Sequence, residues 1–353
     1  MCIDKKNVCQ MIMYCLTLIL VQGSLWMAVP AFSATSITSS DTAISSSDTA
    51  ITSSDTALSS SDTTIKTAGE GRVVTDSRGE HTLPGIPVRP AVLDWNLFEQ
   101  VVELGVKPLT ITDAPAYREW VVKPAIPPGT QNVGTRGEPN LEKIAALHPD
   151  LILITETQQD LIPRLTQIAP VLLYTNFRAT DKQAEVAIRE FQQLAQVFGK
   201  TQVAREKLKQ MTQRFTELKQ QLQASFGTPL PEAVVMRFAD TTSTFLYTRD
   251  SMADYVLHQL GLKPGFSAPP AKWGIVRRPI TTLKNIREGY VLYLLPLYEE
   301  KKLQRSVLWQ AMPFVRHHRV NSVAPVWTYG GAMSLRYMAE AITQSLLEVA
   351  PAS

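Results

Sequence analysis

Residues 201–225 read TQVAREKLKQMTQRFTELKQQLQAS, and this stretch decides the fold. Its large apolar residues recur three or four positions apart, which places them on one face of an α-helix; they are Leu208, Met211, Phe215, Leu218 and Leu222. Gly199 precedes the stretch and FGTPLPEA, with its glycine and prolines, ends it. At about 1.5 Å per residue, such a helix is long enough to run from one globular lobe to another.

On both sides of this helix the sequence alternates between helical and strand patterns. In residues 72–178, helix-like segments such as PNLEKIAALHPD lead into apolar runs such as LILIT. In residues 230–350, AVVMRF and YVLYLLPL have the apolar character of buried strands, and SMADYVLHQLG that of a helix. This alternation is typical of a mostly parallel sheet with helices on its faces. We therefore predict an α/β protein of two lobes, 72–178 and 230–350, joined through a helical region, 179–229, that contains one long bridging α-helix.

The first 68 residues have a different character. MCIDKK is a short basic start, an apolar run follows from Val8 to Phe32, and AVPAFSA provides small residues suited to processing. This pattern predicts a signal peptide over 1–34 and export; an uncleaved membrane anchor is the alternative, since the run is long enough to span a bilayer. Residues 35–68 repeat SSDTAIS-like heptads whose Ser, Thr and Asp are poor helix formers, so we predict a disordered linker.

Composition and motifs exclude several functions. The net charge of +3 over 353 residues and the lack of a basic run with interleaved aromatics argue against nucleic-acid binding. All three cysteines lie within the first fifteen residues, so the rest of the chain has neither a disulfide nor a thiolate site. The sequence contains no G-x-S-x-G, Gly-rich phosphate loop or H-E-x-x-H, and its five histidines are scattered. We predict no enzyme, no cofactor and no metal site.

Aromatic residues on expected loops are the more informative feature. Trp120 lies in the Pro-rich YREWVVKPAIPPG, and Trp273 in SAPPAKWGIVRRP. Trp327 and Tyr329 lie in SVAPVWTYGGAMSL, where alternate residues of an extended loop point to the same side and water can reach them. Arg136, in NVGTRGEPNLE, stands just before a helix. A single tryptophan is usually a core residue and a single arginine a surface ion pair, but this group on loops of both lobes predicts the lining of a cleft.

With these residues the chain resembles the periplasmic ferric-hydroxamate siderophore-binding proteins of the FhuD type. They belong to the helical-backbone family of metal-chelate and cobalamin-binding proteins, also called class III periplasmic binding proteins. The similarity runs from about residue 72 to 348 and rests on YREWVVKPAIPPG, NVGTRGEPNLE, KWG, LWQAMPFVR and APVWTYGGAMS. Each motif is weak alone, and the combination is fairly specific.

The resemblance implies the site residues. It implies that Trp120, Trp273, Trp327 and Tyr329 form the pocket walls and that Arg136 hydrogen-bonds the chelate oxygens. Gln158 stands at about the place of a family tyrosine that helps the arginine, so we expect its amide to take that role. The iron is held by the siderophore, which accounts for the lack of a His, Cys and Asp cluster. Aromatic faces would cover the carbon framework while the guanidinium contacts the oxygens.

The expected function is that of an exported, monomeric substrate-binding protein of an ABC importer. It would capture iron(III)-hydroxamate siderophores between the lobes in the periplasm and deliver them to an inner-membrane permease. One alternative keeps the fold and changes the ligand to ferric citrate, haem or cobalamin. Arg277 and Arg278 near Trp273 favour this alternative. The others are a secreted hydrolase with dispersed catalytic residues and a membrane-tethered sensor.

Overall fold

The computed structural model describes residues 71–351, which lie within one compact unit of the chain. The predicted signal peptide (1–34) and linker (35–68) fall outside the described residues. None of the helices among the described residues has the length and apolarity needed to cross a membrane.

The N-terminal half contains a parallel sheet in the strand order β3-β6-β7. Residues Ala91, Ile152 and Leu172 of these strands are almost completely buried, as expected for a sheet covered on both faces. The elements of this half are β1 (Arg72–Asp76), β2 (Gly79–Leu83), β3 (Pro90–Val92), α2 (Trp95–Glu103), β4 (Thr110–Ile111), α3 (Ala114–Trp120), β5 (Gln131–Asn132), α4 (Leu141–Ala146), β6 (Leu151–Ile154), η1 (Glu156–Leu161), α5 (Ile162–Leu165) and β7 (Val171–Leu173). The hairpin β1-β2 and the parallel pair β4-β5 complete it.

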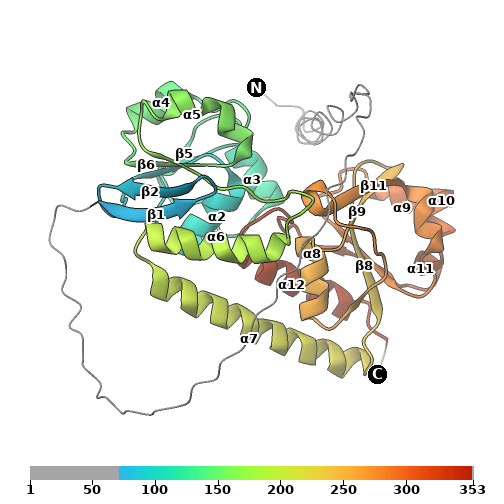
Figure 1. Ribbon diagram of the computed structural model, residues 1–353. Helices are drawn as coiled ribbons and strands as arrows, with labels where there is room; N and C mark the ends of the chain where they lie inside the picture. The colour runs from blue at the N-terminus through green and yellow to red at the C-terminus, as the bar shows by residue number, and fades with distance from the viewer. Residues whose placement is uncertain (1–70, 352–353) are drawn as a thin grey trace, which may run out of the picture. The chain divides into compact units, whose positions relative to one another are not determined.

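Two helices then follow without a strand between them. They are α6 (Gln183–Val197) and the 26-residue α7 (Thr201–Phe226), separated at Gly199, whose φ of 64° ends α6. The buried residues of α7 include Met211, Phe215, Leu218 and Leu222, which confirms the predicted apolar stripe. Figure 1 shows α7 passing beneath α6 and continuing under the C-terminal elements, and α7 packs on α6, α8 and α12. The predicted long bridging helix is therefore confirmed.

The C-terminal half is built on a sheet in the order β11-β9-β8-β12-β13, with β10 beside β8. β12 runs parallel to β8 and β13, whereas β9 is antiparallel to both β8 and β11. Its elements are β8 (Glu232–Phe238), β9 (Ser243–Tyr247), α8 (Met252–Gln259), β10 (Lys263–Pro264), η2 (Lys272–Gly274), β11 (Ile275–Pro279), η3 (Ile280–Asn285), β12 (Tyr290–Leu294), α9 (Glu300–Gln304), α10 (Val307–Gln310), α11 (Pro313–Arg316), β13 (Val320–Val323) and α12 (Ala332–Leu347). The α/β class with mostly parallel sheets is confirmed, and the hairpin β8-β9 with its neighbour β11 is an antiparallel addition.

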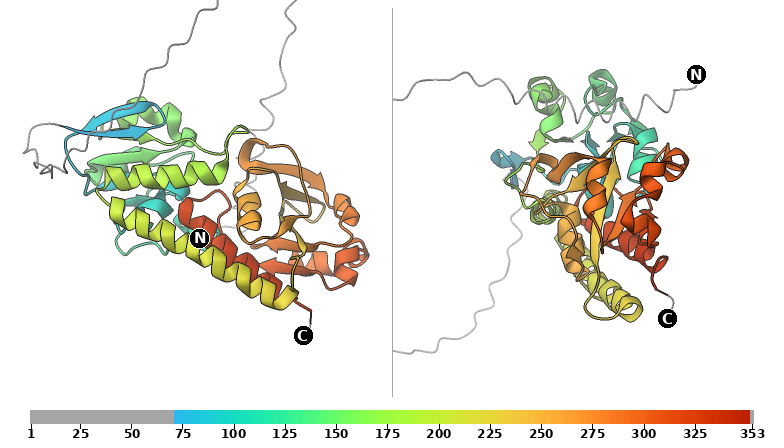
Figure 2. Two further views of the ribbon diagram at one scale, coloured as in Figure 1. Left: turned by 60° about the horizontal axis from the view of Figure 1, so that its bottom comes forward. Right: turned by 90° about the vertical axis from the view of Figure 1, so that its right-hand side faces the viewer.

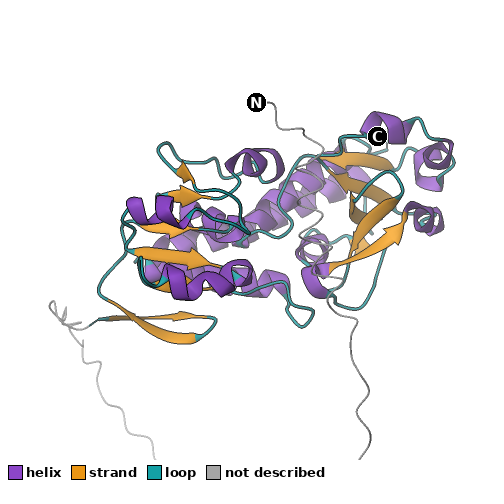
Figure 3. Ribbon diagram, turned by 90° about the horizontal axis from the view of Figure 1, so that it is seen from above, coloured by secondary structure: helices purple, strands orange, loops and turns teal. Residues whose placement is uncertain are grey.

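Each sheet has its own hydrophobic core. The N-terminal core gathers around Ile144, Ile152 and Leu165, and the C-terminal core around Met236, Phe314 and Trp309. The two groups of strands are seen apart in Figure 3, with helices between them. Helix α12 lies alongside α7 in Figure 2 and packs on α2, α6 and α8, so it contacts elements of both halves. The predicted lobe boundaries remain a prediction.

Candidate ligand-binding site

The candidate site forms where strands of both sheets end. Trp95 begins α2 directly after β3, Gln158 follows β6, and Phe177 follows β7. On the other side, Trp327 lies in the segment between β13 and α12. Ligands of open α/β sheets bind outside the carboxyl ends of the parallel strands, because the connecting segments leave polar backbone and side chains there. The topology therefore places two of the predicted site residues, Gln158 and Trp327, and two that were not predicted, Trp95 and Phe177, after strands of the two sheets.

A continuous series of aromatic rings connects the two halves. The ring of Trp95 meets that of Trp327 at 5.0 Å between centroids, and Trp327 meets Tyr329 at 5.2 Å. Tyr329 contacts both Trp273 (5.7 Å) and Phe177 (5.8 Å). The structure thus brings together three of the predicted aromatics, Trp273, Trp327 and Tyr329, and adds Trp95 and Phe177.

Two of these aromatics have unusual backbones. Phe177 and Trp273 adopt φ values of 69° and 63°, in the left-handed region that bulky residues rarely occupy. Their rings stack at 5.5 Å with an interplanar angle of 13°, and the backbone N–H of Trp273 donates to the carbonyl of Phe177 at 2.7 Å. Such strained residues collect at functional sites, where the surrounding structure holds them in place. The pair indicates a site rather than ordinary core packing.

Arg136 lies against this aromatic series. Its guanidinium carbon is 4.1 Å from the ring centroid of Trp95 and 5.6 Å from that of Trp327, a cation–π arrangement. Its Nε is 3.9 Å from the Asp113 carboxylate, which also accepts a hydrogen bond from the Arg136 backbone N–H at 3.0 Å. Within residues 71–351 the guanidinium makes no hydrogen bond of its own. Its N–H donors are available to a ligand.

Two carboxyl groups surround this arginine. Burial raises the pKa of Asp94, although the charge of Arg136 opposes that rise. Burial also raises the pKa of Asp113, against its hydrogen bond from the Arg136 backbone and the arginine charge. The ion pair of Arg136 with Asp113 is therefore the contact that partly balances the arginine charge, whereas burial favours the neutral form of both acids.

Gln158 is placed differently from the expected ligand donor. Its side chain is completely buried, and its amide nitrogen donates to the carbonyl of Arg136 at 2.8 Å and to that of Leu93 at 3.3 Å. Its amide oxygen accepts from the Thr155 backbone N–H at 3.1 Å, within a capping box that starts η1. In this arrangement Gln158 supports the loop that carries Arg136. A contact of Gln158 with the ligand remains a prediction.

Trp120 is linked to the segment of Trp327 through Arg237. It is the last residue of α3, not a loop residue as the sequence suggested, and its ring is 5.0 Å from the guanidinium carbon of Arg237. Arg237 in turn donates to the carbonyls of Leu295 and Val326, beside Trp327. Among the described residues, the buried indole N–H groups of Trp120 and Trp273 find no hydrogen-bond partner.

The expected solvent exposure of Trp327 and Tyr329 is wrong. Their segment is the predicted connection between a strand and a helix, but their exposed fractions are only 5% and 7%. Their rings pack on each other and on aromatics of the N-terminal half, as described above. Sequence alone located them on a loop correctly, because Pro325 and the glycine pair mark it, but loop position did not reveal the partners that cover them.

Sequence reasoning missed Trp95, Phe177 and Arg237. Trp95 could have been found, because LDWNLF places it where a buried strand gives way to a helix, with Asp94 as the N-cap. Phe177 follows β7 in the same manner. Arg237 carries no such signal, since a single arginine within an apolar strand can have many roles.

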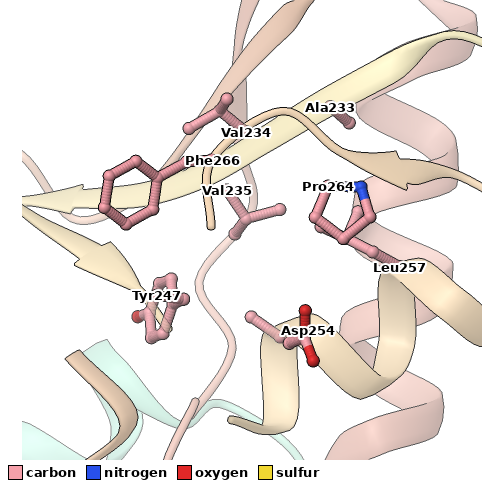
Figure 4. A pocket seen from close by; sticks show the side chains of 9 residues that line it. Ala233, Val234, Val235, Tyr247, Asp254, Leu257, Pro264 and Phe266 are labelled. Atoms are coloured by element: carbon pink, nitrogen blue, oxygen red, sulfur yellow. The ribbon is translucent and has the colours of Figure 1, made fainter. Parts of the chain in front are cut away.

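Two pockets lie elsewhere. One, of about 200 Å³, is polar and is lined by residues of the β1-β2 turn, the segment after β7 and α6, including Ser77, Arg178 and Glu190. The other lies between β8 and α8, and Tyr247, Leu257 and Phe266 are among the side chains that line it (Figure 4). It holds about 10 Å³, space for at most one water molecule. Nowhere in residues 71–351 do three or more His, Cys, Asp or Glu side chains gather to hold a metal ion.

Comparison with known proteins agrees with this architecture. The profile of the periplasmic binding protein family matches residues 91–325. The crystal structure of an Fe3+–Desferal-bound siderophore-binding protein, FhuD of Vibrio cholerae, is 56% identical and superposes with a TM-score of 0.74 over 75% of this chain and 99% of that one. The iron(3+)-hydroxamate-binding protein FhuD of Escherichia coli is 25% identical over 74% of this chain and 87% of its own length. The Fe(3+) dicitrate-binding protein FecB of the same organism is 28% identical over 71% and 81%.

Proposed function

This chain belongs to the periplasmic binding protein family, and on that premise we propose that it captures iron(III)-hydroxamate siderophores for an ABC importer. Its ligand site is the aromatic series with Arg136. The protein acts in the periplasm as a monomer, passes the loaded siderophore to a permease in the inner membrane, and catalyses no reaction. The 56% identity to a protein with a bound iron–Desferal complex supports this ligand class.

The observation that carries the proposal is the state of Arg136. Its guanidinium lies over Trp95 and Trp327, its Nε is 3.9 Å from the Asp113 carboxylate, and within residues 71–351 the guanidinium N–H groups form no hydrogen bond. A ferric trihydroxamate offers the complement: acceptor oxygens around the metal and a carbon framework that aromatic faces cover. The siderophore fills the coordination positions of the iron, so the chain supplies no metal ligand and needs no cofactor of its own.

The ferric citrate alternative has weaker support despite the similarity to a dicitrate-binding protein. A polyanion requires several free cations, yet the Asp113 carboxylate already lies 3.9 Å from Nε of Arg136. Arg277 is committed to Asp240 at 2.8 Å and to Ser243, and Arg278 is exposed beside it. These carboxylates favour a neutral or cationic chelate.

A tryptophan-fluorescence titration of the full chain tests the proposal. The probes are ferrichrome, the iron(III)–Desferal complex, ferric citrate and cobalamin. We expect saturable quenching by a hydroxamate, with Kd raised at least about tenfold in Arg136→Ala and in Trp327→Ala, since each loses a direct contact. Arg277→Ala is the matched control, because it removes the same charge from a residue paired outside the aromatic series.

The other outcomes separate the alternatives. Saturable binding of citrate or cobalamin alone contradicts the hydroxamate class and leaves the family standing. Binding of a hydroxamate that both variants retain contradicts the site. If none of the four probes binds, turnover of ester and amide substrates tests the hydrolase, and fractionation of the native protein with membranes tests the tethered sensor.

A further inference from the structure

Helix α2 meets α12 along one of its faces. Trp95, Glu99 and Glu103 are four residues apart and therefore lie on the same side of α2. Trp95 contacts the ring of Trp327, Glu99 contacts Gly331 and Ser334, and Glu103 accepts a hydrogen bond from Tyr337. The aromatic segment before α12 and the first turns of α12 are thus held by three successive turns of one helix from the other half.

Glu99 is the central contact of this face, and its side chain is almost completely buried. Its Oε2 accepts a hydrogen bond from the Gly331 backbone N–H at 3.1 Å and forms a short hydrogen bond with the hydroxyl of Ser334. Gly331 is the N-cap of α12 and supplies no side-chain cap. Glu99 therefore caps α12 from another element, two residues after Tyr329.

The charged and titratable groups around Glu99 disfavour its negative charge. Asp94 and Glu103 approach it from α2 and its cap, Tyr117 from α3 and Tyr337 from α12. Among the described lysines and arginines none forms an ion pair with it, since Lys207 of α7 pairs with Glu103 instead. Burial raises the pKa of Glu99 to about 8, and the hydrogen bonds from Ser334 and Gly331 only partly oppose this rise. The side chain is therefore neutral at neutral pH.

We propose that Glu99 is a positioning residue whose protonated carboxyl fixes the Trp327–Tyr329 segment, so that ligand affinity depends on the proton it carries. In the protonated group Oε2 can accept from both the Gly331 N–H and the Ser334 hydroxyl while Oε1 carries the proton. When the proton is lost, a charge without a cationic partner appears between α2 and α12, and loosening of this contact relieves it. The aromatic wall then loses its fixed position. This inference rests on the proposed function, because it concerns the same site.

The test is the pH dependence of Kd for the iron(III)–Desferal complex, measured on the full chain between about pH 6 and pH 9, below the titration of the ligand amine. We expect Kd of the wild type to rise at least about fivefold across a midpoint near 8. Glu99→Gln has the shape of the protonated form and should keep Kd within about twofold over the range. Glu340→Gln is the control, since it removes a carboxylate from α12 that pairs with Arg214 and Arg336, and it should follow the wild type.

A flat wild-type profile, or a Glu99→Gln profile equal to that of the wild type, overturns the inference. If Glu99→Gln does not fold, Ser334→Ala replaces it: losing a hydrogen bond that lowers the Glu99 pKa should move the midpoint to higher pH, and an unmoved midpoint is contrary to the proposal. Absence of binding by the wild type at every pH contradicts the proposed function instead. The difference in ligand-free tryptophan emission between the wild type and Glu99→Gln, followed from pH 6 to 9, then still decides whether Glu99 titrates near 8.

Discussion

Arg136 is held in place mainly through its backbone and the ring of Trp95. Asp113 accepts from its backbone N–H, Gln158 donates to its carbonyl, and the guanidinium carbon lies over the ring of Trp95. A planar guanidinium presents its donors in a fixed fork, which a lysine on a flexible stem does not. The loop backbone and the Trp95 ring together set the orientation of the guanidinium, so little side-chain entropy of the arginine is lost when a ligand binds.

Replacing Gln158 with leucine separates its two possible roles. The buried amide satisfies the carbonyls of Leu93 and Arg136, so Gln158→Leu should destabilise the ligand-free protein by about 1–3 kcal/mol, the cost of unsatisfied buried groups. Urea denaturation without ligand measures this. The control Gln159→Leu changes a neighbouring exposed residue and should be nearly neutral. Loss of hydroxamate affinity with unchanged stability would instead favour the direct contact expected from the sequence.

The sequence indicated which residues could line a site, but it did not indicate which residues they contact. Trp273, Trp327 and Tyr329 could be predicted because proline and glycine mark their loops. That they touch Trp95 and Phe177 could not, because those contacts join segments that lie more than 90 residues apart. The amide of Gln158 likewise has several possible partners, and only the folded backbone decides among them.

Helix α2 and the segment leading into α12 approach so closely that the glycine pair is required. A Cβ at Gly331 would lie 2.1 Å from Cγ of Gln100, and one at Gly330 would lie 2.6 Å from Oε2 of Glu99. The reason is proximity rather than backbone conformation at Gly331, whose φ of −84° suits any residue. The close contact between α2 and the segment leading into α12 therefore explains the glycines of the YGG motif.

Gly331→Ala should accordingly push the two helices apart. We expect a loss of about 1–3 kcal/mol in the free energy of unfolding, as for other overpacked sites, and weaker siderophore binding through displacement of Trp327 and Tyr329. Urea denaturation and the fluorescence titration check the two parts. Gly137→Ala is the control, because nothing lies within 4 Å of a Cβ there. Equal stability of Gly331→Ala and Gly137→Ala would contradict this prediction and show that α2 shifts at little cost in free energy.

Helix α7 could be predicted because the apolar residues of its own sequence recur at the helical spacing. The antiparallel strands β9 and β11 were not, because an apolar run such as TFLYT has the same composition in either direction. The 3-10 form of η3, Ile280–Asn285, was likewise not indicated by the local sequence. Direction and helix type there depend on neighbouring strands, information that the local sequence lacks.

On the scale of the whole described unit, buried acids link stability to pH. Glu190 on α6 is 3% exposed, and the hydrogen bond with Gln100 only partly opposes the effect of its burial. Burial raises its pKa to about 8, and the charge of Glu156 adds to this effect. Glu99 behaves similarly, so two carboxyls in the interior hold protons at neutral pH.

The sign of the pH dependence follows from these pKa values. In the unfolded chain both carboxyls lose their protons near 4.5, whereas in the folded state they keep them until about 8. Their contribution is therefore fully present below about pH 4.5 and is lost as pH rises to about 8. From these two groups alone, the protein should be less stable at pH 9 than at pH 5, by at least about 1 kcal/mol.

Glu190→Gln should remove part of this loss, because a neutral amide of the same shape need not ionise. Urea denaturation of the full chain at about pH 5 and pH 9 should give a smaller difference for this variant than for the wild type. Glu185→Gln changes an exposed acid on the same helix, where Lys182 pairs with it, and should keep the wild-type difference. If the free energy of unfolding falls equally with pH in both variants, a buried group other than Glu190 causes the pH dependence. Because α6 packs on α7 and α12 as well as α2, Glu190 lies on a helix that contacts elements of both halves.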